Sequence, residues 1–266
     1  DSNDYKRLVE FYTLVAPDIL NEELQLRITM TVSEMYYKQL ANLDSAKEWY
    51  TKVLDIAPTN LEAINSLEEI YTKLDDHARL IEVLKMKSDI TEDYSEKVNL
   101  LFQQAQLSEE KLQDEAAAID AYEAVLELEE SREAVKALER LYKSAGRWGN
   151  YRDILERQIE WPDTDVVGLH HLLGLTLFEN LGDPDGALDH FKQALEIRAD
   201  YKPAIEVLEK WLTESTFKEQ VADILEPIYL QNLQLDKLLS IMEVKLESMA
   251  DPRERKDIFL KMGKIY

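Results

Sequence analysis

Apolar residues recur along this chain with the spacing of an α-helix. In segment after segment they fall at positions i, i+3, i+4 and i+7, the pattern of a helix that buries one face. Only 7 glycines and 7 prolines occur among the 266 residues, while Ala, Leu, Glu, Lys and Gln are abundant. The pattern therefore predicts helix nearly everywhere and an all-α fold.

One phrase of this pattern returns at a long and nearly constant interval. It reads AKEWYTKVLDI from Ala46, AIDAYEAVLEL from Ala118 and ALDHFKQALEI from Ala187, with steps of 72 and 69 residues. Such a period indicates a stacked repeat array in which each superunit holds two helical hairpins. We expect one continuous array over residues 1–266, with superunits at 22–93, 94–162, 163–232 and, in part, 233–266. Both ends fall inside a superunit, so we expect a segment of a longer protein.

Small and large residues keep a fixed register in this array. The first helix of a hairpin carries a small residue where the second must approach it, and the second carries an alanine four residues before an aromatic ring. The small residues are Ser33, Ala105, Gly174 and Gly263, and the rings are Tyr50, Tyr122 and Phe191. Between the helices, Asp44, Asp114 and Asp183 are expected to act as N-caps.

The rhythm changes once, near residues 213–235. The aromatic marker of the third helix in a superunit moves from Tyr71 to Tyr142 to Trp211, and a fourth copy, Tyr229, follows after only 18 residues. We therefore expect a phase break that adds or skips one helix and alters the direction of the superhelix. Pro227 within the helical pattern is expected to terminate or kink its helix.

These columns resemble the tetratricopeptide repeat family. The first superunit carries Val32, Ser33, Tyr36, Ala46, Tyr50, Val53 and Pro58 at the family positions, and the third carries Leu173, Gly174, Leu177, Gly182, Asp183, Ala187, Phe191 and Ala194. The second superunit departs from the pattern, with Ser108 and Glu130 in the tyrosine and proline columns. Each leading helix is also one residue longer than the family pattern. The resemblance implies a right-handed α-solenoid of about fifteen helices, like the paired-hairpin arrays of long bacterial repeat proteins.

The charge of the chain limits its partners. With 31 Lys and Arg against 54 Asp and Glu, the net charge is −23, which disfavours direct contact with nucleic acid or anionic lipid. Solubility explains this acidity simply, and a cationic partner is the sharper explanation. No apolar run is long enough for a membrane span, and no secretory signal pattern opens the sequence. The compartment stays open, with the cytoplasm favoured.

The sequence contains none of the usual catalytic motifs. There is no cysteine, no phosphate-binding or dinucleotide-binding glycine pattern, and no HExxH or GxSxG motif. The adjacent His170 and His171 would point about 100° apart on a helix, so they cannot chelate one ion together. One should face a neighbouring helix and the other solvent. We therefore expect no enzyme activity, no metal and no cofactor.

A basic stripe is the first candidate binding site. Lys136, Arg140 and Lys143 recur at helical spacing in the segment SREAVKALERLYK. The family resemblance implies that this face lines a concave groove, where it could anchor an acidic peptide tail or a C-terminal carboxylate. The simpler alternative is a solvated face with local ion pairs to Glu133 and Glu139, each contributing a few tenths of a kcal/mol.

The leading helices of the superunits supply the second candidate, a groove face. Among its expected members, Arg27, Tyr37, Phe102 and His171 are the residues we assign to partner binding, because exposed aromatic and basic side chains make good anchors. The remaining members are Met30, Glu34, Asn99, Gln106, Glu109, Leu175 and Phe178. The plainer alternative is that Met30, Phe102, Leu175 and Phe178 pack against adjacent helices.

These observations favour a non-catalytic scaffold that binds a peptide or protein, with cationic patches or an acidic tail, on its concave face. Repeat architecture alone is the warrant for this function. Two alternatives stay open. The chain could be the recruitment module of a larger enzyme whose catalytic domain lies outside it. It could also be an RNA-processing scaffold of half-repeat type, which the acidity disfavours.

Overall fold

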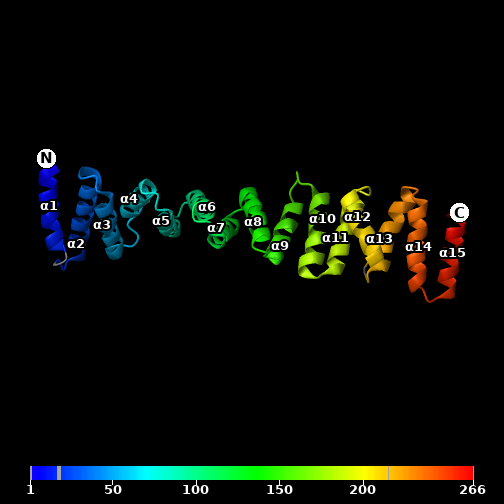
Figure 1. Ribbon diagram of the computed structural model, residues 1–266. Helices are drawn as coiled ribbons and strands as arrows, with labels where there is room; N and C mark the ends of the chain where they lie inside the picture. Colours follow the sequence, from blue (N-terminus) through cyan, green and yellow to red (C-terminus); the bar gives the residue numbers. More distant parts are fainter. Residues whose placement is uncertain (1, 17–18, 215, 266) are drawn as a thin grey trace. The chain divides into compact units, whose positions relative to one another are not determined.

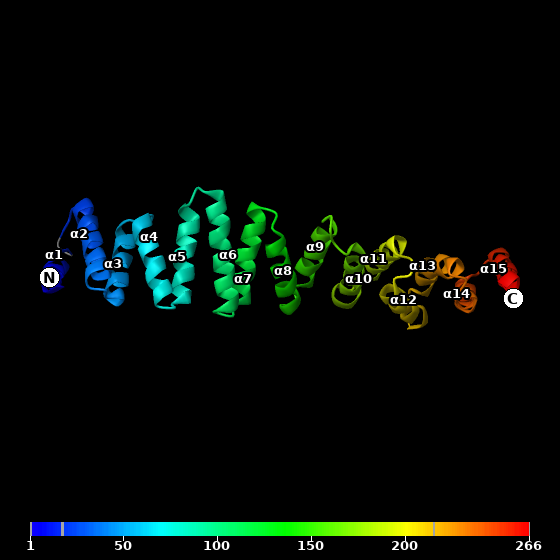
Figure 2. The ribbon, with the colours of Figure 1, turned by 90° about the horizontal axis from the view of Figure 1, so that it is seen from above.

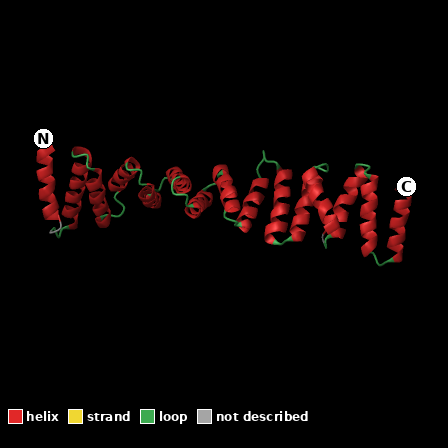
Figure 3. Cartoon of the chain, viewed as in Figure 1, coloured by secondary structure: helices red, strands yellow, loops and turns green. Residues whose placement is uncertain are grey.

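The computed structural model describes residues 2–16, 19–214 and 216–265. Within these ranges the regular structure is entirely helical, with fifteen α-helices joined by short turns (Figure 3), so the all-α prediction is confirmed. None of these described helices is long and apolar enough to cross a membrane. The chain divides into two compact units, Asp1–Leu141 and Tyr142–Tyr266. Within each unit, consecutive helices run antiparallel to one another (Figures 1 and 2).

The first unit is built from successive helices that each pack on the next. Its apolar core lies between the faces of neighbouring helices, with Tyr50, Ile64 and Leu84 among its fully buried side chains. The helices are α1 (Ser2–Val15), α2 (Glu22–Glu34) continued by the π-helical η2 (Met35–Gln39), α3 (Leu43–Ile56), α4 (Leu61–Lys73), α5 (His77–Ile90), α6 (Tyr94–Glu110), α7 (Glu115–Leu128) and the greater part of α8 (Arg132–Ser144).

The second unit repeats this arrangement after the end of α8. Phe191, Leu208 and Leu225 lie at the centre of its core and are fully buried. The helices are α9 (Trp148–Ile159), α10 (Val166–Thr176) continued by the π-helical η3 (Leu177–Leu181), α11 (Pro184–Ile197), α12 (Lys202–Glu214), α13 (Lys218–Gln231), α14 (Leu235–Ser248) and α15 (Pro252–Ile265).

The extra residue in the leading helices has a structural explanation. In η2 and η3 the helix widens to a π turn, which takes up one additional residue without moving the side chains before it. The turn then closes in the same way in all three superunits. The N–H groups of Asn42, Asp114 and Asp183 donate to carbonyl oxygens six residues earlier, at 2.9, 2.8 and 2.9 Å.

The caps that follow these turns correct one prediction. Asp114 and Asp183 are N-caps as expected, and each side chain accepts a hydrogen bond from a backbone N–H three residues later, at 3.0 Å. In the first superunit, however, the cap is Asn42, whose Oδ1 accepts from the Ser45 N–H at 3.1 Å. Asp44 already lies inside α3 and forms an ion pair with Lys47. The assignment of Asp44 as an N-cap was therefore wrong.

The predicted fit of small residues to rings is confirmed in the second unit. Phe191 is fully buried, and a Cβ atom added to Gly174 would lie 2.8 Å from its Cζ atom. Ala187, one turn before Phe191, is also fully buried. The space between α10 and α11 therefore has no room for a side chain at position 174.

Near residues 213–235 the phase break appears as a second helix with the features of the third helix of a superunit. Helix α13 follows α12 directly, yet its turn closes like those after α4 and α8. The Gln234 N–H donates to the Tyr229 carbonyl at 2.9 Å, as Asp76 donates to Tyr71 at 3.0 Å. Two consecutive helices thus carry the pattern that occurs once per superunit elsewhere. The expectation that Pro227 could terminate its helix was wrong, because α13 runs through it. Pro227 lies on the exposed side, so its ring needs no space in the core.

A repeated ion pair supports this assignment. Lys87 on α5 contacts Glu68 on α4 at 2.7 Å, and both side chains are largely buried. Lys245 on α14 contacts Glu226 on α13 in the same way, at the same distances in sequence from the marker tyrosine. Lys245 also contacts Asp223 at 2.6 Å. Hydrogen bonds to these two carboxylates raise the pKa of Lys245, whereas its burial opposes the shift.

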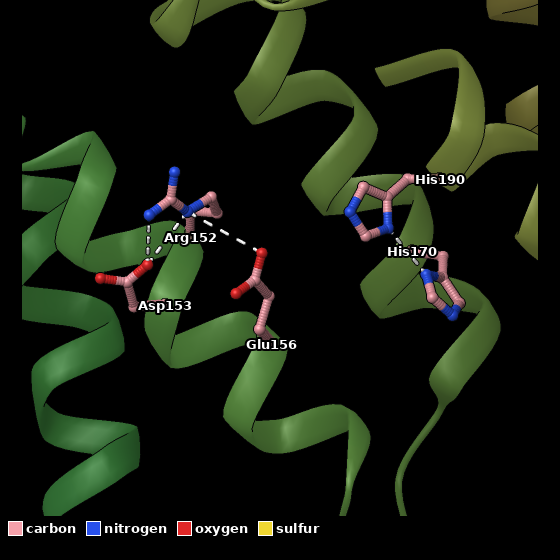
Figure 4. A network of polar contacts seen from close by, with 5 residues as sticks. All are labelled: Arg152, Asp153, Glu156, His170 and His190. Carbon is pink, nitrogen blue, oxygen red and sulfur yellow. Dashed lines mark hydrogen bonds and ion pairs between the residues drawn. The ribbon is translucent and has the colours of Figure 1, made fainter. Parts of the chain in front are cut away.

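The second unit also contains a histidine pair between neighbouring helices. The Nδ1 atoms of His170 on α10 and His190 on α11 lie 2.9 Å apart, so one ring donates and the other accepts (Figure 4). Burial lowers the pKa of both rings, and for His170 the neighbouring His190 lowers it further. Glu156 on α9 and Asp189 and Asp183 on α11 act against the shift of His190. The pair is therefore held in its neutral form.

The first prediction concerns the contact between Gly174 and Phe191. Gly174→Ala should lower the free energy of unfolding by about 1 to 2 kcal/mol, because overpacking outweighs the gain in helix propensity. The matched control is Gly149→Ala in α9, where an added Cβ meets no atom within 4 Å. That variant should be as stable as the parent or slightly more so. Chemical denaturation measures both, and equal stabilities for the two variants would contradict the packing argument.

The second prediction concerns pH. The unfolded histidines take up protons below their ordinary pKa of about 6.5, while the folded pair resists protonation. The pair's contribution to stability is therefore complete above about pH 6.5 and falls as the pH drops towards the lowered folded pKa values. Between about pH 7.5 and pH 5.5, the melting temperature should fall more for the parent than for His170→Gln/His190→Gln. Parallel curves for the two proteins would show that the pair does not contribute.

Candidate functional site

The exposed side of the even-numbered helices in the first unit carries a repeated polar contact. In η2 the Tyr37 hydroxyl donates to Glu69 on α4 and accepts from the Lys73 ammonium at 2.5 Å. The same ammonium lies 4.7 Å from the centre of the Tyr37 ring. Its hydrogen bond with Tyr37 raises the pKa of Lys73. The three side chains therefore hold each other in place on two adjacent helices.

The next superunit uses the equivalent positions with a different chemistry. Glu109 on α6 takes the place of Tyr37, and Arg140 on α8 takes the place of Glu69. The Arg140 Nη1 atom lies 2.5 Å from the Glu109 carboxylate. This hydrogen bond raises the pKa of Arg140. Arg140 is thus paired with a residue of a different helix.

The basic stripe on α8 is only partly neutralised by this pairing. Glu109 contacts one edge of the Arg140 guanidinium group, and the Arg140 side chain is still 60% exposed. Lys136 lies one turn earlier on α8 and is exposed. Lys143 is also exposed but belongs to the second unit. In the first unit, Lys136 and Arg140 therefore present two cations on one stretch of helix.

The other groove residues in the first unit differ in exposure. Arg27 on α2 is exposed, whereas Phe102 on α6 is half-buried with its ring edge-on to Tyr122 at 6.0 Å between centres. Phe102 thus contributes to packing between α6 and α7, as the plainer alternative proposed. Arg27 and Tyr37 leave polar groups at the surface.

Sequence patterns did not reveal a pair of carboxylates near Tyr37. Glu34 on α2 and Glu62 on α4 share a hydrogen bond, which together with partial burial raises the pKa of Glu62. Lys38 lies 3.3 Å from the Glu34 carboxylate. Glu34 was among the expected groove residues, but Glu62, Glu69 and Lys73 were missed. Helical spacing groups residues on one helix and does not tell which residue of the next helix lies opposite.

In the second unit, His171 lies among aromatic rings. Its ring centre is 5.7 Å from those of Phe191 and Tyr201, and burial lowers its pKa. His170 faces α11 as expected, but His171 is half-buried, so the expectation that one of the two would face solvent was wrong. Phe178 likewise packs on Trp211, with ring centres 3.9 Å apart. These residues stabilise the contacts of α10 and η3 with α11 and α12.

The polar groups described above suit contacts with the charged and polar groups of a partner. Within residues 2–16, 19–214 and 216–265, no three His, Cys, Asp or Glu side chains come together as a set that could hold a metal ion. The exposed polar groups are ion pairs and hydrogen bonds between helices, with donors and acceptors turned to the surface. Such an arrangement can bind the charged and polar groups of a partner.

Comparison with known proteins agrees with the repeat pattern. The protein-family model described as tetratricopeptide repeat matches residues 35–60 and 167–201 of the sequence. The first segment covers η2 and α3, and the second covers α10 and α11. No curated protein matches the sequence.

Several solved structures are similar to the chain. The crystal structure of MamA is 24% identical, covering 66% of this chain and 95% of its own, with a TM-score of 0.33. YrrB, described as a TPR protein with an unusual peptide-binding site, is 15% identical, with coverages of 68% and 91% and a TM-score of 0.34. A tetratricopeptide repeat protein from Parabacteroides merdae is 18% identical, with coverages of 98% and 92% and a TM-score of 0.33. The two segments matched by the family model are therefore similar to tetratricopeptide repeats, and each of them contains helices of one hairpin.

Proposed function

We propose that the chain is a non-catalytic scaffold that binds a peptide or protein partner on the exposed side of its even-numbered helices. The polar side chains on this side are fixed before any partner arrives. Tyr37, Glu69 and Lys73 hold one another, and Glu109 holds Arg140. Groups that are already ordered lose less conformational entropy on binding, so this arrangement favours affinity.

Arg140 is the observation that carries the proposal. One edge of its guanidinium group is bound by Glu109, while 60% of the side chain is exposed. A guanidinium group has five N–H donors, so donors remain for a second carboxylate. Lys136, one turn earlier, adds a second cation. The chemistry is that of a site for a peptide carboxylate, either a C-terminus or an acidic side chain.

The positive charge of this site is opposite in sign to the net charge of the whole chain. With a net charge of −23, most of the surface repels an acidic peptide. An acidic segment would therefore be attracted only near the few exposed cations, and such a distribution favours one position over others. Arg27 on α2 and Lys143 on α8 are further cations that we propose as contacts.

A peptide selection tests the proposal. Peptides with free carboxyl ends are selected from a displayed library on the parent chain, and their affinities are measured by fluorescence anisotropy. Lys136→Gln/Arg140→Gln should weaken binding of the selected peptides by about tenfold or more, because a hydrogen bond to a charged group contributes about 1.5 to 3 kcal/mol.

The control makes the same change of net charge elsewhere. Lys6→Gln/Arg7→Gln alters two exposed residues of α1 and should leave the affinity within about twofold of the parent. Lys136→Gln alone leaves the pair of Arg140 and Glu109 intact. Weaker binding by this variant therefore cannot result from the loss of that contact between helices. If the selected peptides bind Lys136→Gln/Arg140→Gln as tightly as the parent, the α8 site is wrong.

A further inference from the structure

A second surface lies on the odd-numbered helices of the second unit. Helices α11 and α13 form the walls of a groove of about 530 Å³. Its floor consists of Leu188, Leu195 and Ile228, and Ile224 and Pro227 rise along the α13 wall. Residues of α12 do not line it. This surface is therefore separate from the even-numbered helices to which we assign the proposed function.

The rim of this groove is acidic. Asp185, Asp189 and Glu196 on α11 and Asp223 on α13 line it together with a single cation, Lys192. Lys192 lies 3.9 Å from Glu196, and Asp223 is held by Lys245 at 2.6 Å. No Lys or Arg of the described residues forms an ion pair with Asp185 or Asp189. Two exposed carboxylates therefore stand beside an apolar floor.

The first unit contains a matched groove with different chemistry. Helices α3 and α5 form a groove of about 590 Å³ that is lined by three cations, Lys47, Lys52 and Arg79, and by three carboxylates. Lys47 and Arg79 are paired with Asp44 and Glu82 at 2.7 and 2.6 Å. Two of the three cations in this groove are therefore paired with carboxylates, and the third, Lys52, lies 4.0 Å from the centre of the Trp49 ring.

Residue by residue, the two grooves differ at the positions that set their charge. Lys47 directly follows the marker Ala46, and the equivalent residue after Ala187 is Leu188. The next position is acidic in both, Glu48 and Asp189. The second groove thus keeps the carboxylate and replaces the cation beside it with an apolar side chain. This change adds Leu188 to the apolar floor and leaves Asp189 without a cation at the preceding position.

Pro227 adds a hydrogen-bond acceptor to the same wall. A proline has no N–H, so residue 227 cannot donate to the carbonyl of Asp223, four residues earlier on α13. That carbonyl lies on the lining segment of the groove, next to the exposed proline ring. An ammonium or guanidinium group is a donor without acceptors, and it would match both this carbonyl and the rim carboxylates.

We propose that the groove between α11 and α13 binds a partner segment in which an apolar side chain is flanked by Lys or Arg. The apolar side chain would occupy the floor formed by Leu188, Leu195 and Ile228. The flanking cations would meet Asp185 and Asp189. Charge complementarity selects this occupant, because the four rim carboxylates disfavour an acidic segment.

Synthetic peptides of about 14 residues test this proposal. One carries Leu with helical spacing and Lys elsewhere, a second replaces each Lys with Glu, and a third keeps the Lys residues but replaces Leu with Gln. The Leu–Lys peptide should bind at least about fivefold more tightly than either of the others in fluorescence anisotropy. Equal binding of the Lys–Gln peptide would show attraction by net charge alone and would overturn the proposal.

Matched variants locate the site. Asp189→Lys should weaken binding of the Leu–Lys peptide by about fivefold or more, while Glu48→Lys, at the same position of the matched groove, should change it by less than about twofold. Both variants alter the net charge equally. Ile224→Ala removes apolar contact from the α13 wall and should also weaken binding, by about threefold. An equal effect of Asp189→Lys and Glu48→Lys would contradict a specific groove.

Three further measurements keep the result decisive. Circular dichroism melts show whether Asp189→Lys folds, and Asp189→Asn replaces it if it does not. The α8 variant Lys136→Gln/Arg140→Gln should bind the Leu–Lys peptide like the parent, so failure of the proposed function and failure of this site can be told apart. Protection of α11 and α13 from hydrogen exchange by the peptide is expected, and protection confined to other helices would overturn the assignment.

Discussion

The structure depends on the close approach of two helices at one small residue. Between α10 and α11 the Phe191 ring fills the space that a Cβ atom at Gly174 would need. One hairpin cannot bury its apolar faces alone, so each must find such a fit and then pack on the next hairpin. The π turns, the six-residue turn closures and the N-caps after them place the second helix where this contact forms. A larger residue at position 174 would therefore push α10 and α11 apart at this contact.

Much of the fold could be predicted because these contacts use a few distinctive residue types. Ala46, Ala118 and Ala187 mark the same helix, and the short step from Trp211 to Tyr229, after Tyr71 and Tyr142, revealed the phase break near α13. The N-cap was misplaced by two residues in the first superunit because both Asn42 and Asp44 are good caps. Only the position where the π turn ends decides between them.

The surface contacts could not be predicted in the same way. Helical spacing placed Tyr37 and Arg140 on exposed faces, but the partners of these residues lie on other helices. The offset and rotation of two packed helices decide that Tyr37 meets Glu69 and that Arg140 meets Glu109. The same reason explains why His171 was expected to be more exposed than it is. Tyr201, which lies beside it, precedes α12 and is distant in sequence.

The two grooves on odd-numbered helices show how the repeat separates folding from recognition. Ala46 and Ala187 are both fully buried, and so are Tyr50 and Phe191 one turn later. Of the residues between them, Glu48 and Asp189 are exposed, while Lys47 in one superunit corresponds to the buried Leu188 in another. Because the buried column is unchanged, such a difference alters the charge and the apolar area of a groove without altering the helices that form it. Each superunit can therefore present its own surface while its stability rests on the same few contacts.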